Sequence, residues 1–239
     1  MRTDEAPSPP RHDPDAARFI RERLPLTPAP GVPEILLHQA APSSGLWRLA
    51  EGDAEGFGSP YWAYCWGGGL ALARHILDRP ETVVGRRVLD LGSGSGLVGI
   101  AAAKAGASLV IASEVNAYAV AALPLNAAAN GVAFAAVVGD LTGGPPPDVD
   151  LVLVGDLFYD ADLAARVTAF LERCVGASVD ALIGDPWRAF LPRSRLRLIA
   201  EYQVADFGAG AGTTASGLFA FEPSSGALRH LHPHAGEGS

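Results

Sequence analysis

The sequence is nearly free of lysine, has little cysteine and contains no apolar run of membrane-spanning length. Lys104 is the only lysine in 239 residues, which argues against a catalytic lysine and against a Walker-type phosphate loop, because that loop needs a lysine. Cys65 and Cys174 are far apart and lack metal-ligand spacing, so we expect two reduced thiols. Lys104 also interrupts the longest apolar candidate, residues 97–112. The N-terminus has no signal-like segment either, so we expect a soluble, cytoplasmic protein.

Positive charge is also in deficit, because 18 Lys and Arg stand against 26 Asp and Glu, for a net charge of −8 at pH 7. A chain of this charge repels nucleic acid and anionic membranes, so we expect neither as a partner, and we expect a monomer. The histidines follow no strand-end motif, and the sequence has no zinc or EF-hand spacing and no G-x-S-x-G motif. The pattern therefore offers no support for a metal centre or a serine hydrolase.

Short apolar segments alternate with helical patterns over most of the chain. We expect strands near residues 86–91, 108–113, 134–139, 151–155, 179–185, 196–204 and 216–221. Helices are expected just before Pro80 and at residues 96–107, 116–131 and 161–174. This alternation predicts an α/β domain with a mainly parallel sheet covered by helices on both faces. Apolar residues make up 49% of the chain, which is enough for the core of one large domain.

The two ends of the chain differ in composition from the expected domain, residues 31–222. Residues 1–30 are rich in proline and charge, so we expect them to be loosely ordered apart from a short helix at 15–24. Residues 223–239, which include "RHLHPHAGEGS", are expected to form a flexible tail.

The most specific segment is "VLDLGSGSGLVGI", residues 88–100, where an apolar strand runs into a glycine-rich turn and then a helix. Gly92, Gly94 and Gly96 let the chain turn tightly and let a ligand approach the backbone, and the helix N-terminus offers unpaired N–H groups. A tight turn without a ligand is the alternative, but three spaced glycines after an acid exceed what turning requires. The segment therefore predicts a nucleotide-binding loop.

Two kinds of nucleotide fit this loop. Gly94, Gly96 and Gly99 match the G-x-G-x-x-G pattern of dinucleotide-binding folds, which favours NAD. The longer pattern D-x-G-x-G-x-G, from Asp90 to Gly96, resembles motif I of the class I S-adenosylmethionine-dependent methyltransferases. In that family the acid lies near the positively charged amino-acid end of the cofactor, whereas it would repel a pyrophosphate. Asp90 therefore favours S-adenosylmethionine over NAD.

Acids also end the next two strands of the expected sheet. Glu114 lies 22 residues after Gly92, where a carboxylate can accept hydrogen bonds from both ribose hydroxyls, although a solvated surface acid is the alternative. Asp140 can accept from the adenine amino group while Leu141 offers a backbone N–H, and a plain loop beginning with Gly-Asp is the alternative. Because the carboxyl ends of parallel strands meet at one edge, the acids together indicate a cofactor site there.

Five landmarks together are more specific than the glycine loop: "LTP", "PYWAYCWGGGLALARHILD", "VLDLGSGSG", "GDLFYD" and "LIGDP". They resemble the lysine methyltransferases of methyltransferase family 16, over about residues 24–222, and within it the members that act on the electron transfer flavoprotein β subunit. The resemblance implies a Rossmann-like class I methyltransferase fold: a mostly parallel seven-stranded sheet, helices on both faces, a C-terminal antiparallel hairpin and a short N-terminal extension. It also implies S-adenosylmethionine as cofactor, S-adenosylhomocysteine as product and the flavoprotein β subunit as protein substrate.

The resemblance also assigns a role to "GDLFYD", where an acid-x-x-aromatic motif follows the fourth strand of the sheet. It implies that Asp156 and Tyr159 are catalytic. A carboxylate can attract the incoming ammonium and then orient the neutral amine, and an aromatic ring can line a channel for the alkyl stem. The alternatives are a helix N-cap for Asp156, for which Asp160 is better placed, and a core aromatic for Tyr159.

The segment "PYWAYCWGGG" gathers aromatic residues just before a helix. The resemblance implies that Trp66 packs along the cofactor and that Tyr61 and Trp62 border the lysine channel, and an aromatic plug over the domain is the alternative. Trp187 stands where the family is expected to have a smaller residue, so we predict that it alters one wall of the substrate site. The expected cofactor contacts are Trp66, Asp90, Gly92, Ser93, Gly94, Gly96, Leu97, Glu114, Val115, Asp140, Leu141 and Gly155.

Other functions stay open on the sequence alone. The methyl acceptor can be a lysine of another protein or a small nitrogen compound. A non-catalytic S-adenosylmethionine-binding protein that holds a partner, and an NAD-dependent oxidoreductase, are alternatives from other classes.

Overall fold

The computed structural model describes residues 14–41, 44, 46, 59–205 and 212–223 of the chain. Its sheet strands are β3 (Arg87–Leu91), β4 (Leu109–Glu114), β5 (Ala135–Val138), β6 (Leu151–Gly155), β7 (Asp180–Asp185), β8 (Leu196–Ala205) and β9 (Thr213–Phe221). The helices are α1 (Pro14–Arg23), α3 (Gly67–Asp78), α4 (Leu97–Lys104), α5 (Ala117–Ala129) and α6 (Ala161–Gly176). Short 3-10 turns occur at Pro60–Ala63, Pro80–Thr82 and Arg193–Arg195. Within the described ranges, every helix is too short or too polar to cross a membrane.

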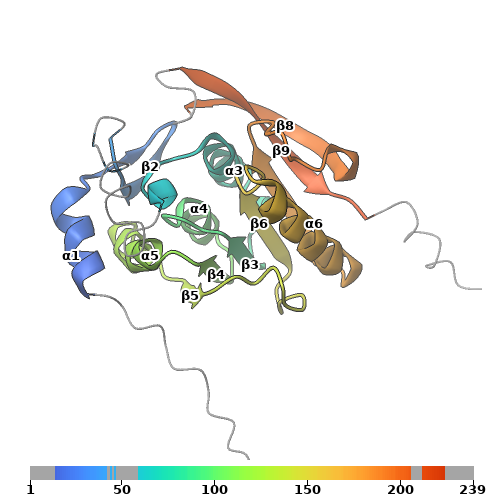
Figure 1. The fold of residues 1–239 in the computed structure, drawn as a ribbon, viewed down its shortest axis with the longest axis horizontal. Helices are drawn as coiled ribbons and strands as arrows, with labels where there is room; N and C mark the ends of the chain where they lie inside the picture. The colour runs from blue at the N-terminus through green and yellow to red at the C-terminus, as the bar shows by residue number, and fades with distance from the viewer. Residues whose placement is uncertain (1–13, 42–43, 45, 47–58, 206–211, 224–239) are drawn as a thin grey trace, which may run out of the picture.

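The seven strands form one sheet in the order β5-β4-β3-β6-β7-β9-β8 (Figure 1). The five strands from β5 to β7 are parallel, and β9 is antiparallel to both of its neighbours. This arrangement confirms the predicted parallel sheet with a C-terminal antiparallel hairpin. The chain runs outward from β3 in one direction and then returns to place β6 on the other side of it. Such a reversal opens a crevice at the carboxyl ends of the two strands, where open α/β sheets bind ligands.

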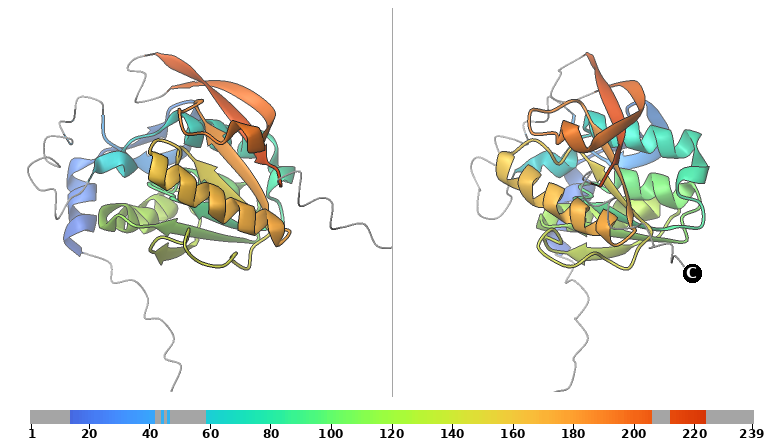
Figure 2. Two further views of the ribbon diagram at one scale, coloured as in Figure 1. Left: turned by 45° about the vertical axis from the view of Figure 1, so that its right-hand side comes forward. Right: turned by 90° about the vertical axis from the view of Figure 1, so that its right-hand side faces the viewer.

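Both faces of the sheet are buried, which explains why its parallel strands are apolar without alternation. Along β3, Val88 packs with residues of α3 and α4, whereas the next residue, Leu89, packs with residues of α6. The two cores lie on opposite sides of the sheet, as the right-hand view in Figure 2 shows for α6 and α3. The site described below lies where these layers meet at the carboxyl edge.

The N-terminal segment is more ordered than its composition predicts. The short predicted helix is present as α1, which lies beside α5 and buries Ala16 and Ile20, and Leu24 directly after it is buried as well (Figure 1). It leads into an antiparallel pair, β1 (Leu26–Ala29) and β2 (Val32–His38). The expectation of loose order is therefore wrong for residues 14–30, because an amphipathic helix with an apolar partner can bury enough surface to fold. The predicted loose ends at residues 1–13 and 224–239 lie outside the described residues.

Two asparagines, Asn126 in α5 and its C-cap Asn130, attach β2 to the domain. Asn126 Oδ1 accepts a hydrogen bond from the His38 backbone N–H at 2.8 Å. Asn130 pairs with both backbone groups of Leu36, accepting at 2.9 Å and donating at 2.6 Å. Because an edge strand must satisfy its backbone groups, these side chains take the place of a further strand. The sequence shows only two polar residues in an apolar helix, so this role depends on the tertiary fold.

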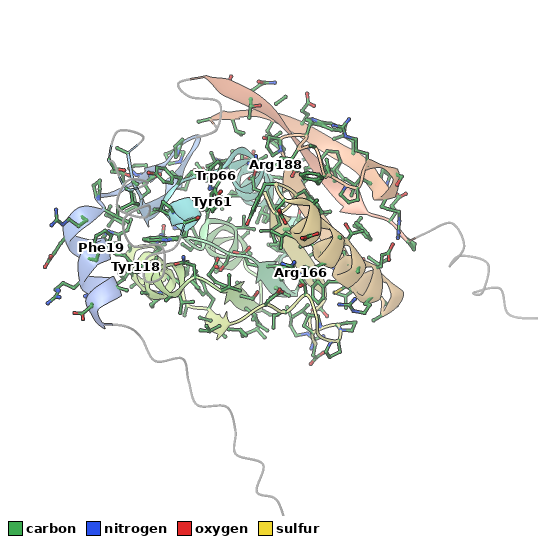
Figure 3. The ribbon with its side chains drawn as sticks, viewed as in Figure 1. Phe19, Tyr61, Trp66, Tyr118, Arg166 and Arg188 are labelled. Atoms are coloured by element: carbon green, nitrogen blue, oxygen red, sulfur yellow. The ribbon has the colours of Figure 1, made fainter. Side chains whose placement is uncertain are left out.

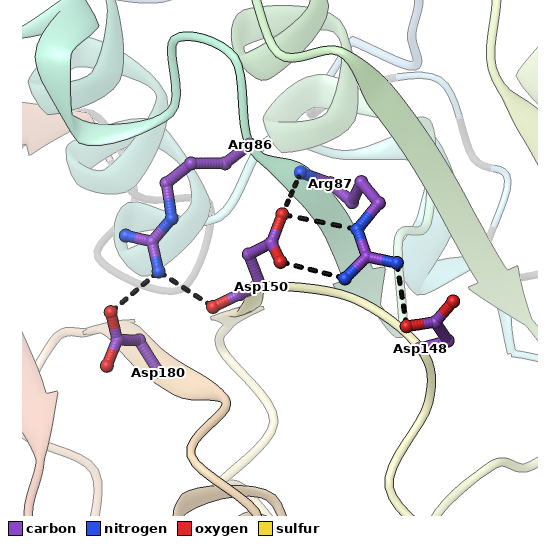
Figure 4. A network of polar contacts seen from close by, with 5 residues as sticks. All are labelled: Arg86, Arg87, Asp148, Asp150 and Asp180. Carbon is purple, nitrogen blue, oxygen red and sulfur yellow. Dashed lines mark hydrogen bonds and ion pairs between the residues drawn. The ribbon is translucent and has the colours of Figure 1, made fainter.

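The amino edge of the sheet holds a cluster of ion pairs (Figure 4). Arg87 binds both carboxylate oxygens of Asp150, with its Nη2 2.9 Å from Oδ1, and its Nη1 lies 2.6 Å from Asp148 Oδ1. Arg86 Nη2 donates to Asp180 Oδ2 at 2.6 Å and to the Asp150 carbonyl at 2.7 Å. These contacts join the starts of β3, β6 and β7 on the side of the sheet opposite the site.

Candidate active site

A cavity of about 780 Å³ opens at the carboxyl ends of β3, β4 and β6. Its volume lies within the range of roughly 300–1,000 Å³ that is typical of small-molecule sites. The predicted site residues that line it are Tyr61, Trp62, Trp66, Asp90, Gly92, Ser93, Gly94, Leu97, Glu114, Val115, Asp140, Leu141, Gly155, Asp156 and Tyr159. The structure thus brings the residues assigned to cofactor, channel and chemistry into one cavity, with the exception of Gly96.

The glycine loop between β3 and α4 depends on left-handed backbone. Gly92 and Gly94 line the cavity with φ values of 64° and 53°, which other residues adopt only at a cost. A Cβ on Gly92 would stand 2.8 Å from Leu157 Cδ2, so a side chain here would also displace a residue that lines the cavity.

Gly96, the third glycine of the loop, begins the helix that follows it. It is the N-cap of α4 with a φ of 87°, and it does not line the cavity. A Cβ there would stand 3.0 Å from Leu123 and 3.2 Å from Phe134. The positive φ and these two close side chains account for a glycine at this position, and the cofactor contact stays a prediction.

Gly96 has no side chain to cap the N-terminus of α4, and Asp90 satisfies a backbone N–H there instead. Its Oδ2 accepts a hydrogen bond at 2.8 Å from the backbone N–H of Gly99, in the first turn of α4. The carboxyl is 2% exposed, and this burial raises its pKa to about 7, an effect that the Gly99 bond only partly offsets. Asp90 thus combines the predicted position beside the cavity with a structural bond. A Cβ on Gly99 would stand only 3.1 Å from Asp90 Oδ2, so this close approach favours glycine at residue 99.

Glu114, at the end of β4, ties its strand to the glycine loop. Its Oε2 accepts from the Gly94 N–H at 2.8 Å, and its Oε1 accepts from the N–H groups of Val115 and Asn116 at 2.6 and 2.9 Å. A carboxylate has about four acceptor positions, so one is left for a ligand hydroxyl. The predicted ribose contact is therefore compatible with this geometry if Glu114 keeps its backbone bonds and accepts one further hydrogen bond from the ribose.

Asp140, after β5, is also partly engaged. Its Oδ1 accepts from the N–H and the hydroxyl of Thr142 at 2.8 and 2.6 Å, while Oδ2 lies 3.6 Å from Arg166 Nε. The Thr142 hydroxyl bond is the main cause of the lowered pKa of this carboxyl. Arg166 also lines the cavity, across it from Trp66 (Figure 3). The predicted adenine contact therefore has to use the oxygen that faces Arg166.

Asp156, the predicted catalytic acid, is paired with an arginine that the sequence did not single out. Its Oδ1 accepts from Arg188 Nη2 at 2.7 Å and from Arg188 Nε at 3.1 Å. Its Oδ2 accepts from the Gly69 backbone N–H in the first turn of α3 at 2.9 Å. The side chains of Asp156 and Arg188 are 7% and 23% exposed, so the pair is largely shielded from water. Arg188 also lies over Trp66, with its guanidinium carbon 5.6 Å from the ring centroid (Figure 3).

The backbone around this pair is strained and tightly packed. Asp156 and Trp187 have φ values of 60° and 63°, in the left-handed region that disfavours side chains. The N–H of Asp156 donates to the Gly184 carbonyl at 3.1 Å, and a Cβ on Gly68 would stand only 2.2 Å from that same oxygen. The glycines that open α3 therefore let the helix start lie directly against the ends of β6 and β7.

Asp185 holds Arg188 from the other side. This fully buried acid ends β7, and its Oδ1 accepts from the Arg188 backbone N–H at 2.7 Å. Burial, with a smaller contribution from the nearby Asp156, raises the pKa of Asp185 to about 7. Its Oδ2 has no hydrogen-bond partner among the residues that the structure describes.

An aromatic mouth, formed by Tyr61, Trp66 and Tyr159, borders the cavity. Tyr61 stacks on Tyr159 with centroids 5.5 Å apart and contacts Trp66 at 5.7 Å. The Trp66 Nε1–H donates to the Tyr61 carbonyl at 2.8 Å, which fixes the ring. Tyr61 and Tyr159 are 44% and 47% exposed, so the mouth is open to a large molecule.

Two other aromatics are packed into the frame around the site. Trp62 lines the cavity, is 4% exposed and stacks on Tyr118 with centroids 6.1 Å apart, an arrangement that fits the alternative of an aromatic plug. Trp187 does not line the cavity. Its ring packs edge-on against Phe219 at 4.8 Å and its Nε1–H donates to Glu201 at 3.2 Å. Both rings therefore stabilise the frame around the site.

The cavity and its loops agree with comparisons to known proteins. Residues 54–188 match the family described as lysine methyltransferase, methyltransferase family 16. The electron transfer flavoprotein beta subunit lysine methyltransferase of Homo sapiens is 34% identical over 220 residues, 88% of this chain and 84% of that protein. The Xenopus laevis protein of the same name is 37% identical over 215 residues, 86% of each chain.

A solved structure supports the fold. The crystal structure of a candidate RNA methyltransferase from Pyrococcus horikoshii superposes with a TM-score of 0.52 and 16% identity, covering 74% of this chain and 96% of that one. Together with the strand order, it shows a Rossmann-like methyltransferase fold. With a family match over more than half of the chain and relatives above 30% identity along most of it, this protein belongs to methyltransferase family 16, the S-adenosylmethionine-dependent lysine methyltransferases.

Proposed function

We propose that this enzyme methylates lysine side chains of the electron transfer flavoprotein β subunit. The observation that carries the proposal is the near full-length identity of 34% and 37% to two proteins named for that reaction. The acidity of the chain, with a net charge of −8, supports it as well, because it is complementary to a protein surface that presents lysine.

The cavity fits S-adenosylmethionine by the chemistry of its lining. Glycine-loop backbone and the carboxylates of Glu114 and Asp140 suit a ribose and an adenine, and Leu97 and Leu141 offer apolar contact. Asp90, buried and close to the loop, suits a cationic amino group. When bound, this cofactor supplies a methyl group on a positively charged sulfur, which an amine can attack.

The aromatic mouth suits the lysine acceptor. The stacked rings of Tyr61 and Tyr159 offer their outer surface to its alkyl stem, and an aromatic face attracts its ammonium. The amine must lose a proton before it reacts, and the exposure of both rings lets that proton pass to water. The chain thus contributes mainly position, by holding the amine in line with the methyl group.

The test is the intact mass of the flavoprotein β subunit after incubation with the purified enzyme and S-adenosylmethionine. We expect mass gains in steps of one methyl group, which excess S-adenosylhomocysteine suppresses. Unchanged mass, in a preparation that binds S-adenosylhomocysteine, would remove this acceptor while leaving the cofactor assignment intact.

A lysine of another protein is the second candidate acceptor. The half-exposed rings of the aromatic mouth favour it over a small amine, because a small substrate is usually enclosed. Methyl transfer from labelled S-adenosylmethionine to the proteins of a host extract distinguishes the two. Label confined to the flavoprotein β subunit supports the first candidate, and label in one other protein supports the second.

A further inference from the structure

The pairing of Asp156 with Arg188 changes what the acid can do. An acid that meets an incoming ammonium needs an accessible oxygen. Asp156 already accepts three hydrogen bonds from the chain itself, and its side chain is only 7% exposed. The positive charge that it attracts is already present in the guanidinium of Arg188. A further cation gains little from a carboxylate whose charge is compensated.

Arg188 is held from three directions. Asp156 binds its guanidinium, the Trp66 ring lies 5.6 Å from it, and Asp185 accepts from its backbone N–H at 2.7 Å. An arginine fork bound on one side and stacked on the other has little freedom to move. Its side chain therefore forms a fixed part of the cavity wall, immediately behind the aromatic mouth.

Backbone strain also indicates that Asp156 and Arg188 are held in place for a function. Asp156 and Trp187, the residue before Arg188, both occupy the left-handed region. Such conformations persist where the surrounding structure demands them, and they cluster at functional sites. Here they aim the two charged side chains at each other from the ends of neighbouring parallel strands, β6 and β7.

We propose that Arg188 is a positioning residue for methyl transfer and that Asp156 acts through it. The two side chains form one unit, the Asp156–Arg188 bracket, which ties the first turn of α3 to the ends of β6 and β7 and sets the orientation of Trp66. The bracket holds the aromatic mouth in the geometry that aligns the acceptor lysine. This inference rests on the proposed lysine methylation and adds the residue that positions its acceptor.

A direct role for Asp156 predicts a different pattern of variants. If Asp156 met the lysine itself, Arg188 would compete with the substrate for the carboxylate. Removing the guanidinium would then keep or raise the rate, while removing the acid would abolish it. The bracket predicts instead that the loss of either partner has the same consequence.

The first experiment compares Asp156→Asn, Arg188→Met, Arg188→Lys and the double variant Asp156→Asn/Arg188→Met in steady-state methylation. Each single loss is expected to lower kcat by about tenfold to a hundredfold, because misplacing a reacting group by about 1 Å can cost about a hundredfold. KM for the acceptor should change by less than about threefold, because its surface contacts persist. The double variant should lie within about twofold of the worse single variant, and Arg188→Lys should recover part of kcat.

Matched controls come from the same loop and from the opposite edge. Arg193→Met removes another arginine stacked on a tryptophan, Trp187, and Asp180→Asn removes another acid paired with an arginine, Arg86. Both controls should retain kcat. An Arg188→Met enzyme with wild-type or higher kcat would overturn the proposal, as would losses in the two single variants that multiply in the double variant.

A second experiment tests the bracket without an acceptor. The unfolding midpoint and the affinity for S-adenosylhomocysteine are measured for the wild type, both single variants and the double variant. Each single variant leaves one largely buried charge unpaired, so the double variant should be more stable than additive losses predict. Affinity for S-adenosylhomocysteine should fall by less than about fivefold, because the variants disturb one expected cofactor contact, Trp66, and leave the glycine loop, Glu114 and Asp140 in place.

The two experiments separate the bracket from the acceptor assignment. Additive losses of stability would overturn the bracket whatever the enzyme methylates. A wild-type enzyme that leaves the flavoprotein unmodified, but shows coupled losses, would contradict only the proposed acceptor.

Discussion

The two edges of the sheet use the same residue, aspartate, in opposite electrostatic settings. At the amino edge, hydrogen bonds from Arg87 hold the pKa of the Asp150 carboxyl at about 2. At the carboxyl edge, burial raises the pKa of Asp90 and Asp185 to about 7. A backbone N–H reaches each of these two acids, but it does not offset the loss of water.

The difference shows where the chain supplies its own counter-charge. The amino edge pairs its acids with arginines. Among the residues that the structure describes, Asp90 forms no ion pair, although it lies beside the cavity. We therefore predict that a cationic ligand pairs with Asp90 in the cavity, whereas the acids that are already paired with arginines stabilise the fold.

The largest expected effect comes from breaking the packing that exists only at the carboxyl edge. A Cβ on Gly68 would stand 2.2 Å from the Gly184 carbonyl and 2.6 Å from Asp156 Oδ2. We expect Gly68→Ala to lower the free energy of unfolding by about 3 kcal/mol and to abolish methylation, because α3 must move away from β6 and β7. The measurement is denaturant unfolding with an activity assay. Gly176→Ala is the control, since a Cβ there meets nothing within 4 Å, and it should stay near wild type.

The next effect concerns the pH dependence of stability. Because the folded-state pKa of Asp185 is raised, the stability that it contributes is fully present below its ordinary pKa of 3.8 and is lost as pH rises through about 7. Asn does not titrate, so Asp185→Asn should gain stability relative to wild type between pH 5 and pH 8, by on the order of a few kcal/mol. Denaturant unfolding at several pH values measures the difference. A constant difference across that range would show that Asp185 ionises normally.

A smaller effect is expected in cofactor-product binding. If Asp90 pairs with the cationic amino group of S-adenosylhomocysteine, it must be ionised in the complex. A pKa near 7 leaves only about a tenth of it ionised at pH 6, so affinity should rise up to about tenfold from pH 6 to pH 8. Calorimetric titration measures this rise. In Asp90→Asn the rise should vanish, and if it persists, another group is responsible.

The smallest effect should follow from a change at the amino edge. The Arg87–Asp148 pair joins side chains that are 39% and 93% exposed. Water screens such a pair, so Asp148→Asn should lower the unfolding midpoint by only about 1–3 °C and leave S-adenosylhomocysteine affinity unchanged. Thermal unfolding and the same titration check both parts. A loss of affinity here would break the contrast between the two edges.

Much of the fold could be predicted because its signals are local. Apolar runs, glycine turns and helix patterns each lie within a few neighbouring residues, and the structure confirms the strands and the sheet type that they indicate. The order of the N-terminal segment was harder to predict, because its content of proline and charge does not reveal that α5 provides an apolar partner. The packing of Trp62 and Trp187 was also hard to predict, because their partners Tyr118 and Phe219 are distant in the sequence.

The sequence by itself determined the parallel sheet, the glycine loop and the acids at the strand ends, because strands, helices and glycine turns follow from local patterns. Only the tertiary structure decided how those acids are used. It placed Arg188 against Asp156, brought Leu123 close to Gly96, and left Asp90 buried beside the cavity. The charge state of a carboxyl depends on burial and on partners distant in the chain, and no local pattern in the sequence carries that information.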